Sequence, residues 1–474
     1  MEWKQLLSDK RYGHISSKKT SDLRTEFQRD YHRIIGSASF RRLQDKTQVF
    51  PLDRGDFVRT RLTHSLEVAS FAKSLGQMCF AYIMQNNLDE SIDESIKADI
   101  CNILECAGLL HDIGNPPFGH FGETAIREWF RNNLGKLSLD GIPLTERLTE
   151  QMQRDLCNFE GNAQVLRILT KLHYLVDENG MHLTYALLNT LIKYPVSSCG
   201  INKESGNIKD KKMGYYYAEK ELFDTIVNTT GAVNCRYPLT FLLEAADDIA
   251  YKTADIEDAV KKGLITYDEL LAELRSERYR GKCGDEQELK AYNEVVDGLE
   301  TFRKRAAKNK TYEPEFNAVQ NWLVSVQGFL LRCAMFGFTS NYKEIMAGTF
   351  GKEVIAVSYG KTLADALSDI AYRYAFNSKQ IVRLEIAAGT MFEFLLDKFV
   401  PAAILHDTDR EMTAIDKRMI RIISDNYVQA YEVNSRDRDE NEKLYLRLLL
   451  VTDYICGMTD GYAKHIYQEF KGIS

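Results

Sequence analysis

Residues 109–123 place two histidines and two carboxylates around a turn that is rich in glycine and proline. The adjacent pair His111 and Asp112 offers one nitrogen and one oxygen ligand to a divalent metal ion from a single point on the backbone. His120 and Glu123 are spaced i,i+3, so their side chains face the same way in a helix that begins near Phe118. The stretch therefore predicts half of a metal site and a second pair of groups that can handle a proton.

Two other segments offer the ligands that would complete such a site. His64 lies near the start of an apolar helical pattern in residues 57–85, and Arg61 precedes it by about one turn. An acidic stripe begins inside the apolar segment 239–263, which favours burial of Asp247 or Asp248. A buried carboxylate needs a charged partner, and a metal ion is one such partner.

A set of two histidines and two carboxylates indicates a metal-dependent phosphohydrolase. These ligands suit Mn²⁺, Mg²⁺, Fe²⁺, Ni²⁺ or Co²⁺, and such an ion can bind a phosphoryl oxygen and ionise a water. Arg61 can neutralise a phosphate at the metal, while His120 can move a proton at the leaving oxygen, its tautomer fixed by Glu123. A second doublet, His406 and Asp407, has no Gly-Asn-Pro turn behind it, so we do not expect it to bind a metal.

Helices are the elements that must position these residues. Strand signals are few, and apolar residues recur at helical spacing in segments 57–85, 94–113, 122–175, 239–263 and 316–400. Gly114 and the two prolines that follow end the helix 94–113, so His111 and Asp112 project from its last turn. The final helix is predicted to run from Tyr445 to Phe470. We therefore predict an all-α fold with little or no sheet.

The composition divides the chain into three parts. Residues 1–30 are polar and basic and indicate a solvated N-terminal arm with little core of its own. The highly charged segment 275–315 marks the boundary between a core in residues 31–274 and a helical C-terminal region in residues 275–474 that packs on it. A chain of 474 residues with 44% hydrophobic residues is long enough to bury a large core.

Charge and cysteine content restrict the class of protein. The net charge of −7 argues against a broadly basic surface, although the lysine-rich loop 200–212 can still cover an anionic ligand. The nine scattered cysteines form no CxxC pair, which is typical of reduced thiols in a cytoplasmic protein. The N-terminus lacks an apolar signal region, and no run approaches the roughly 18 apolar residues of a membrane span. We therefore expect a cytoplasmic protein without a membrane partner.

Several segments together resemble the bacterial deoxyguanosinetriphosphate triphosphohydrolases (dGTPases), a family of the HD phosphohydrolase superfamily. The superfamily is named for its His-Asp doublet. The resemblance lies, in family order, in residues 40–50, 59–65, 111–120, 159–164, 244–251 and 457–460. It implies an HD-domain helical core with an additional helical C-terminal region.

The resemblance also implies a role for individual residues. The family's metal ligands match His64, His111, Asp112 and Asp247, and its catalytic dyad matches His120 and Glu123. Asp247 is preferred over Asp248 because the family's ligand precedes a sugar-gating tyrosine, here Tyr251, by one helical turn. The residues that match substrate contacts are Gln48, Val49, Arg61, Lys193, Tyr194, Tyr251 and Asp255.

The substrate implied by the resemblance is a deoxynucleotide. Gln48 and Val49 match contacts to the deoxyribose, with Gln48 on the 3′-OH, and Tyr251 would crowd a 2′-OH and so reject ribonucleotides. The matches to phosphate and sugar contacts are Arg61, Lys193, Tyr194 and Asp255. The implied reaction converts dGTP and water into deoxyguanosine and triphosphate with a divalent metal ion, Mg²⁺ or Mn²⁺ or another first-row metal. Members of the family are commonly hexameric, and some bind single-stranded DNA.

Two alternative functions remain compatible with the same site. One is another HD phosphohydrolase, which would act on a cyclic dinucleotide or on guanosine tetraphosphate. The deoxyribose-contacting matches Gln48, Val49 and Tyr251 argue against it. The other is a non-catalytic protein that binds single-stranded DNA, although every proposed catalytic residue is present.

Overall fold

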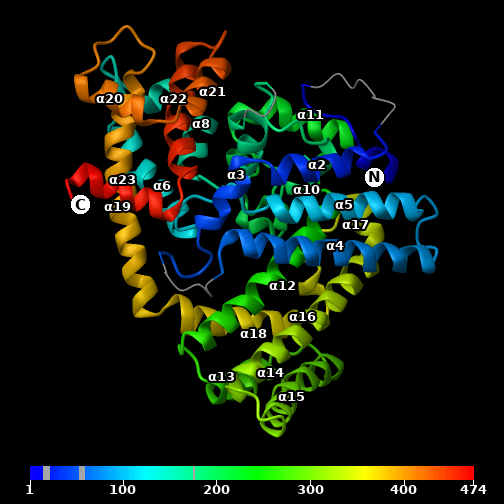
Figure 1. Cartoon of the computed structure of the whole chain (residues 1–474). Coiled ribbons are helices and arrows are strands. Elements are labelled where there is room, and N and C mark those ends of the chain that lie inside the picture. Colours follow the sequence, from blue (N-terminus) through cyan, green and yellow to red (C-terminus); the bar gives the residue numbers. More distant parts are fainter. Residues whose placement is uncertain (14–21, 53–58, 174–176, 474) are drawn as a thin grey trace.

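The computed structural model describes residues 1–13, 22–52, 59–173 and 177–473. Helices form most of these residues, and their one sheet is the antiparallel pair of β1 (Ser138–Leu139) and β2 (Ile142–Pro143). The predicted all-α fold is therefore confirmed (Figure 1). Before the C-terminal region the α-helices are α1 (Trp3–Leu6), α2 (Glu26–Ile35), α3 (Ala38–Arg41), α4 (Arg61–Gln85), α5 (Glu94–Leu110), α6 (His120–Asn133), α7 (Leu144–Arg147), α8 (Glu150–Cys157), α9 (Gly161–Arg167), α10 (Tyr185–Leu191), α11 (Lys220–Thr230), α12 (Pro238–Lys261) and α13 (Tyr267–Leu274).

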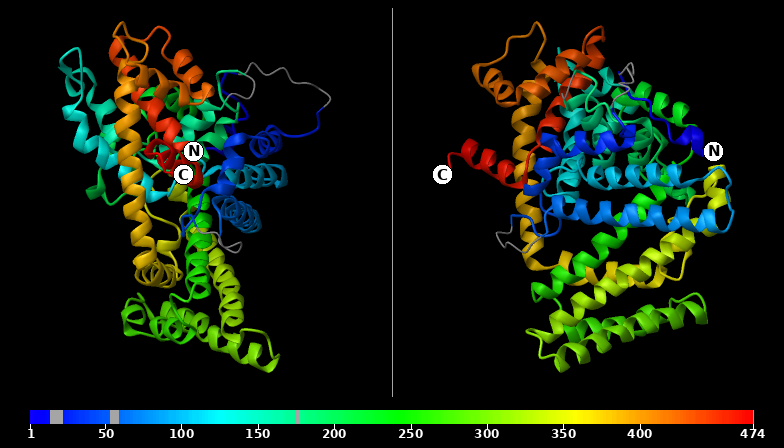
Figure 2. Two further views of the ribbon diagram at one scale, coloured as in Figure 1. Left: turned by 60° about the vertical axis from the view of Figure 1, so that its left-hand side comes forward. Right: turned by 45° about the vertical axis from the view of Figure 1, so that its right-hand side comes forward.

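The C-terminal region is also helical and shares the core of the preceding residues. One continuous cluster of buried apolar side chains extends from Trp3 to Ile466. Figure 2 shows α13, α14 and α15 at one end of the molecule, while α19 runs along its side. The helices of this region are α14 (Glu277–Arg280), α15 (Glu286–Lys308), α16 (Pro314–Ser340), α17 (Tyr342–Ala347), α18 (Lys361–Ala371), α19 (Lys379–Leu405), α20 (Ala414–Ile422), α21 (Asp425–Asn434), α22 (Glu440–Cys456) and α23 (Asp460–Lys471).

Helices α4, α5 and α12 form the part of the fold that carries the candidate site. α4 and α5 lie side by side, and α12 packs across both (Figure 1). The α4 helix begins at a capping box in which Thr60 and Thr63 satisfy each other's backbone N–H groups. The α5 helix begins at Asp93, whose carboxylate accepts a hydrogen bond from the Ile96 amide, and it ends at Leu110, three residues before the predicted end at Ile113. His111 is its C-cap residue, so the His111-Asp112 doublet follows the last turn instead of belonging to it.

Gly108 sets the distance between α4 and α5. A Cβ atom at this position would lie 2.4 Å from the Cα and 2.6 Å from the backbone nitrogen of Ala69. Only a residue without a side chain permits this approach, because backbone atoms cannot rotate away as a side chain can. His64 lies on α4 and His111 directly follows α5, so the close packing also brings these two imidazole rings together.

The described part of the N-terminal arm packs on the core instead of extending into solvent. Trp3 and Leu6 are buried, and the indole nitrogen of Trp3 donates a hydrogen bond to the Tyr342 hydroxyl over 2.6 Å. Arg11 is also buried and forms an ion pair with Asp30. The polar composition of this segment hid these contacts, because a few large apolar side chains are enough to anchor a short segment.

The predicted last helix, from Tyr445 to Phe470, is wrong in one respect, because it is two helices. α22 ends at Cys456 and α23 begins at Asp460. Gly457 lies against Tyr427, where a Cβ would approach the phenolic oxygen to 1.9 Å, and the Thr459 side chain caps α23. The break directs the Asp460 side chain towards the candidate site.

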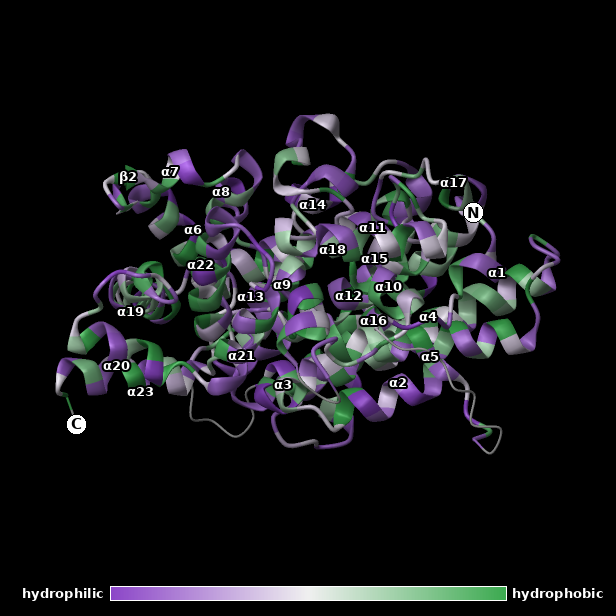
Figure 3. Cartoon of the chain, turned by 90° about the horizontal axis from the view of Figure 1, so that it is seen from above, coloured by the Kyte–Doolittle hydropathy of each residue, from purple (hydrophilic) through white to green (hydrophobic). Residues whose placement is uncertain are grey.

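One described helix, α16, is long and apolar enough by composition to cross a membrane. It packs against α4, α12 and α15, and its side chains Trp322, Leu330 and Phe338 are fully buried. These contacts are those of a core helix. Seen from above in Figure 3, hydrophobic residues lie mainly on the helix faces that point into the molecule, and α16 lies among them.

We predict that Gly108→Ala destabilises the protein. The added methyl group collides with the backbone of α4, and overpacking of this kind costs about 1–3 kcal/mol in the free energy of unfolding. Gly389→Ala in α19 is the matched control, since no atom lies within 4 Å of its new Cβ. Because alanine favours a helix over glycine, the control should gain up to about 1 kcal/mol. Thermal and urea unfolding measure both changes, and an equal effect of the two variants would contradict this account of the packing.

Candidate active site

Three of the predicted metal ligands meet where α4, α5 and α12 cross. The Nε2 atom of His64 lies 3.2 Å from Oδ1 of Asp247, and Nε2 of His111 lies 3.4 Å from the same oxygen. The two imidazole rings are in edge contact, with centroids 5.2 Å apart. One ligand atom from each residue lies within 4.8 Å of the others. Metal–nitrogen and metal–oxygen bonds are about 2.0–2.2 Å long, so one ion fits between these atoms.

Burial and unsatisfied atoms support the fit of a cation. His64 is fully buried, and within the part of the chain that the structure describes Nδ1 of His64 and Nε2 of His111 have no hydrogen-bond partner. The Nδ1 atom of His111 lies 2.8 Å from the Gly108 carbonyl, which fixes the ring and leaves Nε2 to face Asp247. A cavity of about 20 Å³, which accommodates one ion or water, lies against His111 and Asp247. Buried polar nitrogens of this kind cost free energy unless a hydrogen-bond partner or a metal ion binds them.

Mutual attraction shifts the pKa values in this cluster. Burial would lower the pKa of His111, but the carboxylates of Asp112 and Asp247 raise it to about 9. Burial would raise the pKa of Asp247, yet the two histidines hold it well below its usual range. The site therefore has an excess of negative charge whenever its histidines are neutral, which is the form that binds metals.

Asp112 lies beside this cluster and is held by two other groups. Its Oδ2 accepts a hydrogen bond from Nη1 of Arg61 over 2.6 Å, and its Oδ1 accepts one from the Asn115 amide. Oδ1 is 3.7 Å from Nε2 of His111. Burial raises the pKa of Asp112, but the Arg61 guanidinium and His111 bring it down to about 2. Asp112 thus stays ionised and aligned at the edge of the cluster.

His120 and Glu123 form a hydrogen-bonded pair on the first turn of α6. Nδ1 of His120 and Oε2 of Glu123 are 3.0 Å apart. The His120 side chain is 80% exposed and that of Glu123 only 1%, so the pair reaches from the surface into the core. The second carboxylate oxygen of Glu123 accepts the Gly161 amide over 2.8 Å. The hydrogen bond and charge of Glu123 raise the pKa of His120, whereas burial, Lys212 and Arg61 lower it. Glu123 thus holds the ring and favours its protonated form.

Arg61 joins the metal cluster to this dyad. Its guanidinium bonds Asp112 and also lies against Gly119, where a Cβ would approach Nη2 to 2.4 Å. Gly119 has a φ of +57° and immediately precedes His120. The arginine is nearly fully buried, so its charge acts in a low-dielectric region between the two groups. An anion bound between the cluster and the dyad would meet this guanidinium.

The turn that joins Asp112 of the metal site to His120 of the dyad is held by residues far away in the sequence. The buried ammonium of Lys46 donates to the carbonyls of Asn115 and Cys456 over 2.6 and 2.7 Å. Burial lowers the pKa of Lys46 to about 8. The carboxylate of Asp460 accepts the Phe118 amide over 2.9 Å and the Thr47 amide over 3.0 Å. No local pattern in the sequence predicts that Lys46 and Asp460 bind this turn, although both lie in segments that carry the family resemblance.

Lys193 and Tyr194 lie at the C-terminal side of α10. The Lys193 ammonium is 3.4 Å from Oε1 of Glu244, whose other oxygen accepts a hydrogen bond from Arg236 over 2.7 Å. Lys193 lines the same small cavity as His111 and Asp247. Tyr194 is buried, and its pKa is raised by burial and lowered in part by Lys193. The structure therefore brings Lys193 to the metal cluster directly.

Asp255, one helical turn beyond Tyr251 on α12, is a buried carboxylate. It is fully buried, neither oxygen has a hydrogen-bond partner among the described residues, and burial together with Asp258 raises its pKa well above the usual range. Oε1 of Gln48 is likewise buried and unsatisfied. Native proteins rarely leave such atoms unpaired, so both are candidates for binding a polar ligand group. Val49, next to Gln48, is buried against Phe50 and Ile381.

Asp248, the alternative ligand, faces a different partner. Its carboxylate accepts a hydrogen bond from Lys252 over 2.6 Å, one helical turn away. It is absent from the group of ligand atoms formed by His64, His111 and Asp247 in the described part of the chain. Periodicity alone could not separate Asp247 from Asp248, because adjacent residues on a helix differ in direction by only about 100°.

Comparison with known proteins agrees with this geometry. The HD domain family matches residues 61–177, the segment that contains His64, the His111-Asp112 doublet and the dyad. The fold and site therefore define an HD-domain protein, a class whose members depend on a metal ion.

Relatives of known family extend the match over the whole chain. A deoxyguanosinetriphosphate triphosphohydrolase-like protein of Listeria monocytogenes is 48% identical over 100% of both chains, and one of Synechocystis is 34% identical over 100% of both. The deoxyguanosinetriphosphate triphosphohydrolase of Salmonella typhimurium is 34% identical over 94% of both chains. The chain belongs to the deoxyguanosinetriphosphate triphosphohydrolase family of the HD superfamily.

We predict that His111→Ala abolishes tight binding of Mn²⁺. The substitution removes one of the three ligand atoms of the cluster and leaves Asp247 with His64 as its remaining histidine neighbour. Loss of one ligand is expected to weaken metal binding about 10- to 100-fold or more. His406→Ala, which alters the second His-Asp doublet, is the control and should bind Mn²⁺ as the unaltered protein does. Titration calorimetry measures both, and unchanged affinity in His111→Ala would remove the metal assignment.

Proposed function

We propose that this protein is a metal-dependent triphosphohydrolase of deoxynucleotides, which converts dGTP and water into deoxyguanosine and triphosphate. One observation carries the proposal: the His64, His111 and Asp247 cluster and the His120–Glu123 dyad lie on either side of the buried Arg61. In this arrangement a cation site, a phosphate-binding guanidinium and a proton donor lie one after another, with the guanidinium in the middle. Cleavage of a phosphoester needs these three functions together.

The proposed metal ligands are His64, His111, Asp112 and Asp247. A bound Mg²⁺ or Mn²⁺ would supply charge to a phosphoryl oxygen and lower the pKa of an attacking water. Arg61 orients Asp112 and stays free on its other side to hold the phosphate, and Lys193 adds positive charge at the same cavity. Tyr194, the residue after Lys193, is proposed to contact the phosphate or the sugar as well. These side chains bind and orient the phosphate chain.

His120 is the proposed proton donor to the leaving 5′-oxygen of the deoxynucleoside. The Nδ1 side of the ring faces Glu123, whose carboxylate accepts a hydrogen bond from Nδ1–H and thereby fixes the tautomer. The other nitrogen, Nε2, points away from Glu123. Because Glu123 is nearly fully buried, little solvent screens its charge from the imidazole. Positioned acids of this type contribute about 10²- to 10⁴-fold to a rate.

The proposed sugar site uses the unsatisfied atoms near α12. Oε1 of Gln48 can accept the one hydrogen bond that the 3′-OH donates, and Asp255, whose raised pKa favours its protonated form, can donate one to the 3′-OH oxygen. Val49 offers an apolar surface to the deoxyribose. Tyr251, one turn before Asp255, is the proposed steric gate, whose ring would collide with a 2′-OH. Selection of a deoxynucleotide then follows from a clash with the ribonucleotide and needs no contact to the base.

The site argues against the two alternative functions. An HD enzyme that acts on cyclic dinucleotides or guanosine tetraphosphate has no use for a deoxyribose pocket, and a non-catalytic protein that binds single-stranded DNA has no use for the dyad. Homo-oligomerisation as a hexamer, binding of single-stranded DNA and a cytoplasmic location remain predictions from the family resemblance and from composition.

Product analysis with each dNTP, alone and in pairs, tests the proposed function. We expect dGTP to yield deoxyguanosine and inorganic triphosphate in the presence of Mn²⁺ or Mg²⁺, and Asp112→Ala to yield neither. Incubation with ribonucleotides, cyclic dinucleotides and guanosine tetraphosphate provides the comparison. If no dNTP releases triphosphate under either metal, alone or in a pair, the proposal is wrong.

Tyr251→Ala is predicted to admit ribonucleotides. Removing the ring removes the clash with the 2′-OH, so the preference for dGTP over GTP, as a ratio of kcat/KM, should fall about 10- to 100-fold. Tyr312→Ala is the control because Tyr312 is 86% exposed and outside the site. Continued rejection of GTP by an active Tyr251→Ala variant would exclude the steric role.

Glu123→Gln is predicted to move the alkaline limb of the pH profile to lower pH. Glu123 raises the pKa of His120, so the unaltered protein keeps its proton donor charged up to a higher pH. Loss of the carboxylate lets Lys212 and Arg61 lower that pKa without opposition, and kcat then declines from a lower pH onward. The exposed Glu146→Gln in α7 has the same charge change and should keep the original profile. An unshifted limb in Glu123→Gln would contradict the dyad.

A further inference from the structure

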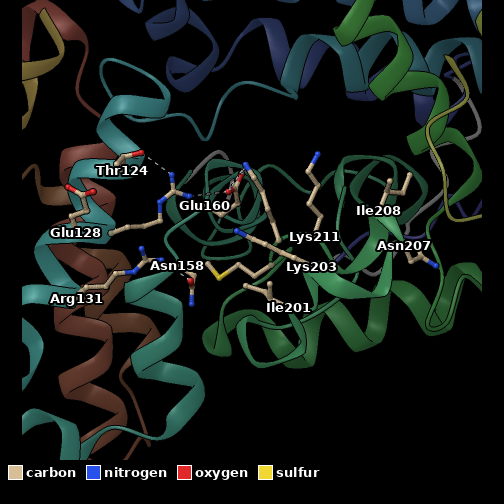
Figure 4. A pocket seen from close by; sticks show the side chains of 14 residues that line it. Thr124, Glu128, Arg131, Asn158, Glu160, Ile201, Lys203, Asn207, Ile208 and Lys211 are labelled. Carbon is tan, nitrogen blue, oxygen red and sulfur yellow. Dashed lines mark hydrogen bonds and ion pairs between the residues drawn. The ribbon is translucent and has the colours of Figure 1, made fainter. Parts of the chain in front are cut away.

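A large cavity lies next to the dyad and outside the metal cluster. Its volume is about 620 Å³, which is within the range of small-molecule sites. Figure 4 shows side chains of α6 on one side, the loop 200–212 on the other, and Glu160 between them. The loop is built from short 3₁₀ turns that include Lys203–Ser205 and Ile208–Asp210, and the Ile208 amide donates to the Gly351 carbonyl.

The cavity is lined by more positive than negative charge. Two of its residues are acidic, Glu128 and Glu160. Five of its residues are cationic, namely Arg127, Arg131, Lys203, Lys211 and Lys212. This excess stands out in a protein whose net charge is −7.

The acidic residues neutralise only part of this positive charge, because Glu160 pairs with Lys212 and lies near Arg127. Both oxygens of Glu160 are already used, since Lys212 lies 2.9 Å from Oε2 and the Asn162 amide donates to Oε1 over 2.7 Å. Lys203 and Lys211 form no ion pair with any residue that the structure describes. Their ammonium groups therefore remain available to an anion that enters the cavity.

Arg127 lies between the cavity and the dyad and borders both. Nη2 of Arg127 lies 3.8 Å from Oε2 of Glu123, and its Nη1 lies 3.8 Å from Oε2 of Glu160. Lys212, on the opposite wall, also helps to hold the pKa of Glu123 low against the effect of burial. An anion that leaves the neighbourhood of His120 thus meets Arg127 and Lys212 first, and then the unpaired lysines.

We propose that this cavity binds polyphosphate and receives the triphosphate that is released beside His120. The inference rests on the proposed function, because triphosphate is the product of that reaction. A triphosphate anion carries several negative charges, and guanidinium and ammonium groups bind phosphate oxygens through charge-assisted hydrogen bonds. The cavity offers these donors on two facing walls, which suits a chain of linked phosphates better than a single phosphate. It draws the product away from the metal cluster and makes room for the next substrate.

Binding of sodium tripolyphosphate to the full-length protein tests the cavity without turnover. Calorimetry is carried out with the divalent cation chelated, so the metal cluster does not contribute to binding. The double variant Lys203→Glu/Lys211→Glu should raise the Kd about tenfold or more, which is the loss expected for charge-assisted contacts. Lys304→Glu/Lys343→Glu, at exposed lysines on α15 and α17, carries the same charge change and should leave the Kd unchanged. No binding by the unaltered protein, or an equal effect of both double variants, overturns the proposal.

Two further ligands distinguish the source of the polyphosphate. GTP, which the proposed enzyme does not hydrolyse, tests whether the cavity takes the triphosphate of a nucleotide instead of the free product. An equal loss of GTP affinity in Lys203→Glu/Lys211→Glu supports the polyphosphate site but overturns its assignment to released product. A loss confined to tripolyphosphate supports both. Inorganic phosphate should bind much more weakly, since equal affinity would overturn the match to a chain of phosphates.

Product inhibition separates this inference from the proposed function. Added tripolyphosphate should inhibit dGTP turnover, with an inhibition constant that rises in Lys203→Glu/Lys211→Glu in parallel with the Kd. Tripolyphosphate binding without triphosphate release from any dNTP would refute the proposed function and leave a polyphosphate site. Release of triphosphate from dGTP without cavity-dependent binding would refute the cavity alone.

Discussion

The candidate site depends on the contact between α4 and α5 at Gly108. The backbone of Gly108 lies directly against Ala69, and this approach leaves His64 and His111 with their rings in edge contact. α12 then packs on both helices and adds Asp247 between the two imidazoles. One buried and two partly buried polar groups are tolerated there because each has an opposite or metal-binding partner within reach. Close helix packing is thus the physical condition for the cluster.

A second constraint fixes the dyad relative to the cluster. The turn between Asp112 and His120 contains few side chains that could hold it, and its backbone groups are bound by Lys46 and Asp460 instead. Asp460 is available because the C-terminal chain breaks at Gly457. The C-terminal region therefore contributes to the site although it supplies no proposed metal ligand. Its function is to hold the backbone of the turn, and this explains why the family resemblance extends to residues 457–460.

Charge is distributed across the site in a consistent order. Carboxylates gather on α12, where Asp247 faces the histidines and Glu244 is balanced by Lys193 and Arg236. Beyond Arg61 and the dyad the sign reverses, and the cavity lined by α6 and the loop 200–212 is basic. A cation is therefore favoured at one end and an anion at the other. Such a gradient directs a polyanion along one path in a protein that is acidic as a whole.

The sequence by itself determined the helical fold, the residue types of the site and the family, because hydrophobic periodicity, helix-ending glycine and proline, and motif order are local properties. It placed His120 and Glu123 on one helical face correctly, since an i,i+3 pair needs only one helix. Local spacing left Asp247 and Asp248 open, the family resemblance favoured Asp247, and the structure places Asp247 against the histidines. Only the tertiary structure decided that Trp3 is buried, that α22 and α23 are separate, and that Lys46 and Asp460 hold the turn. These outcomes depend on contacts between residues far apart in the chain, and no local pattern encodes which distant groups will meet.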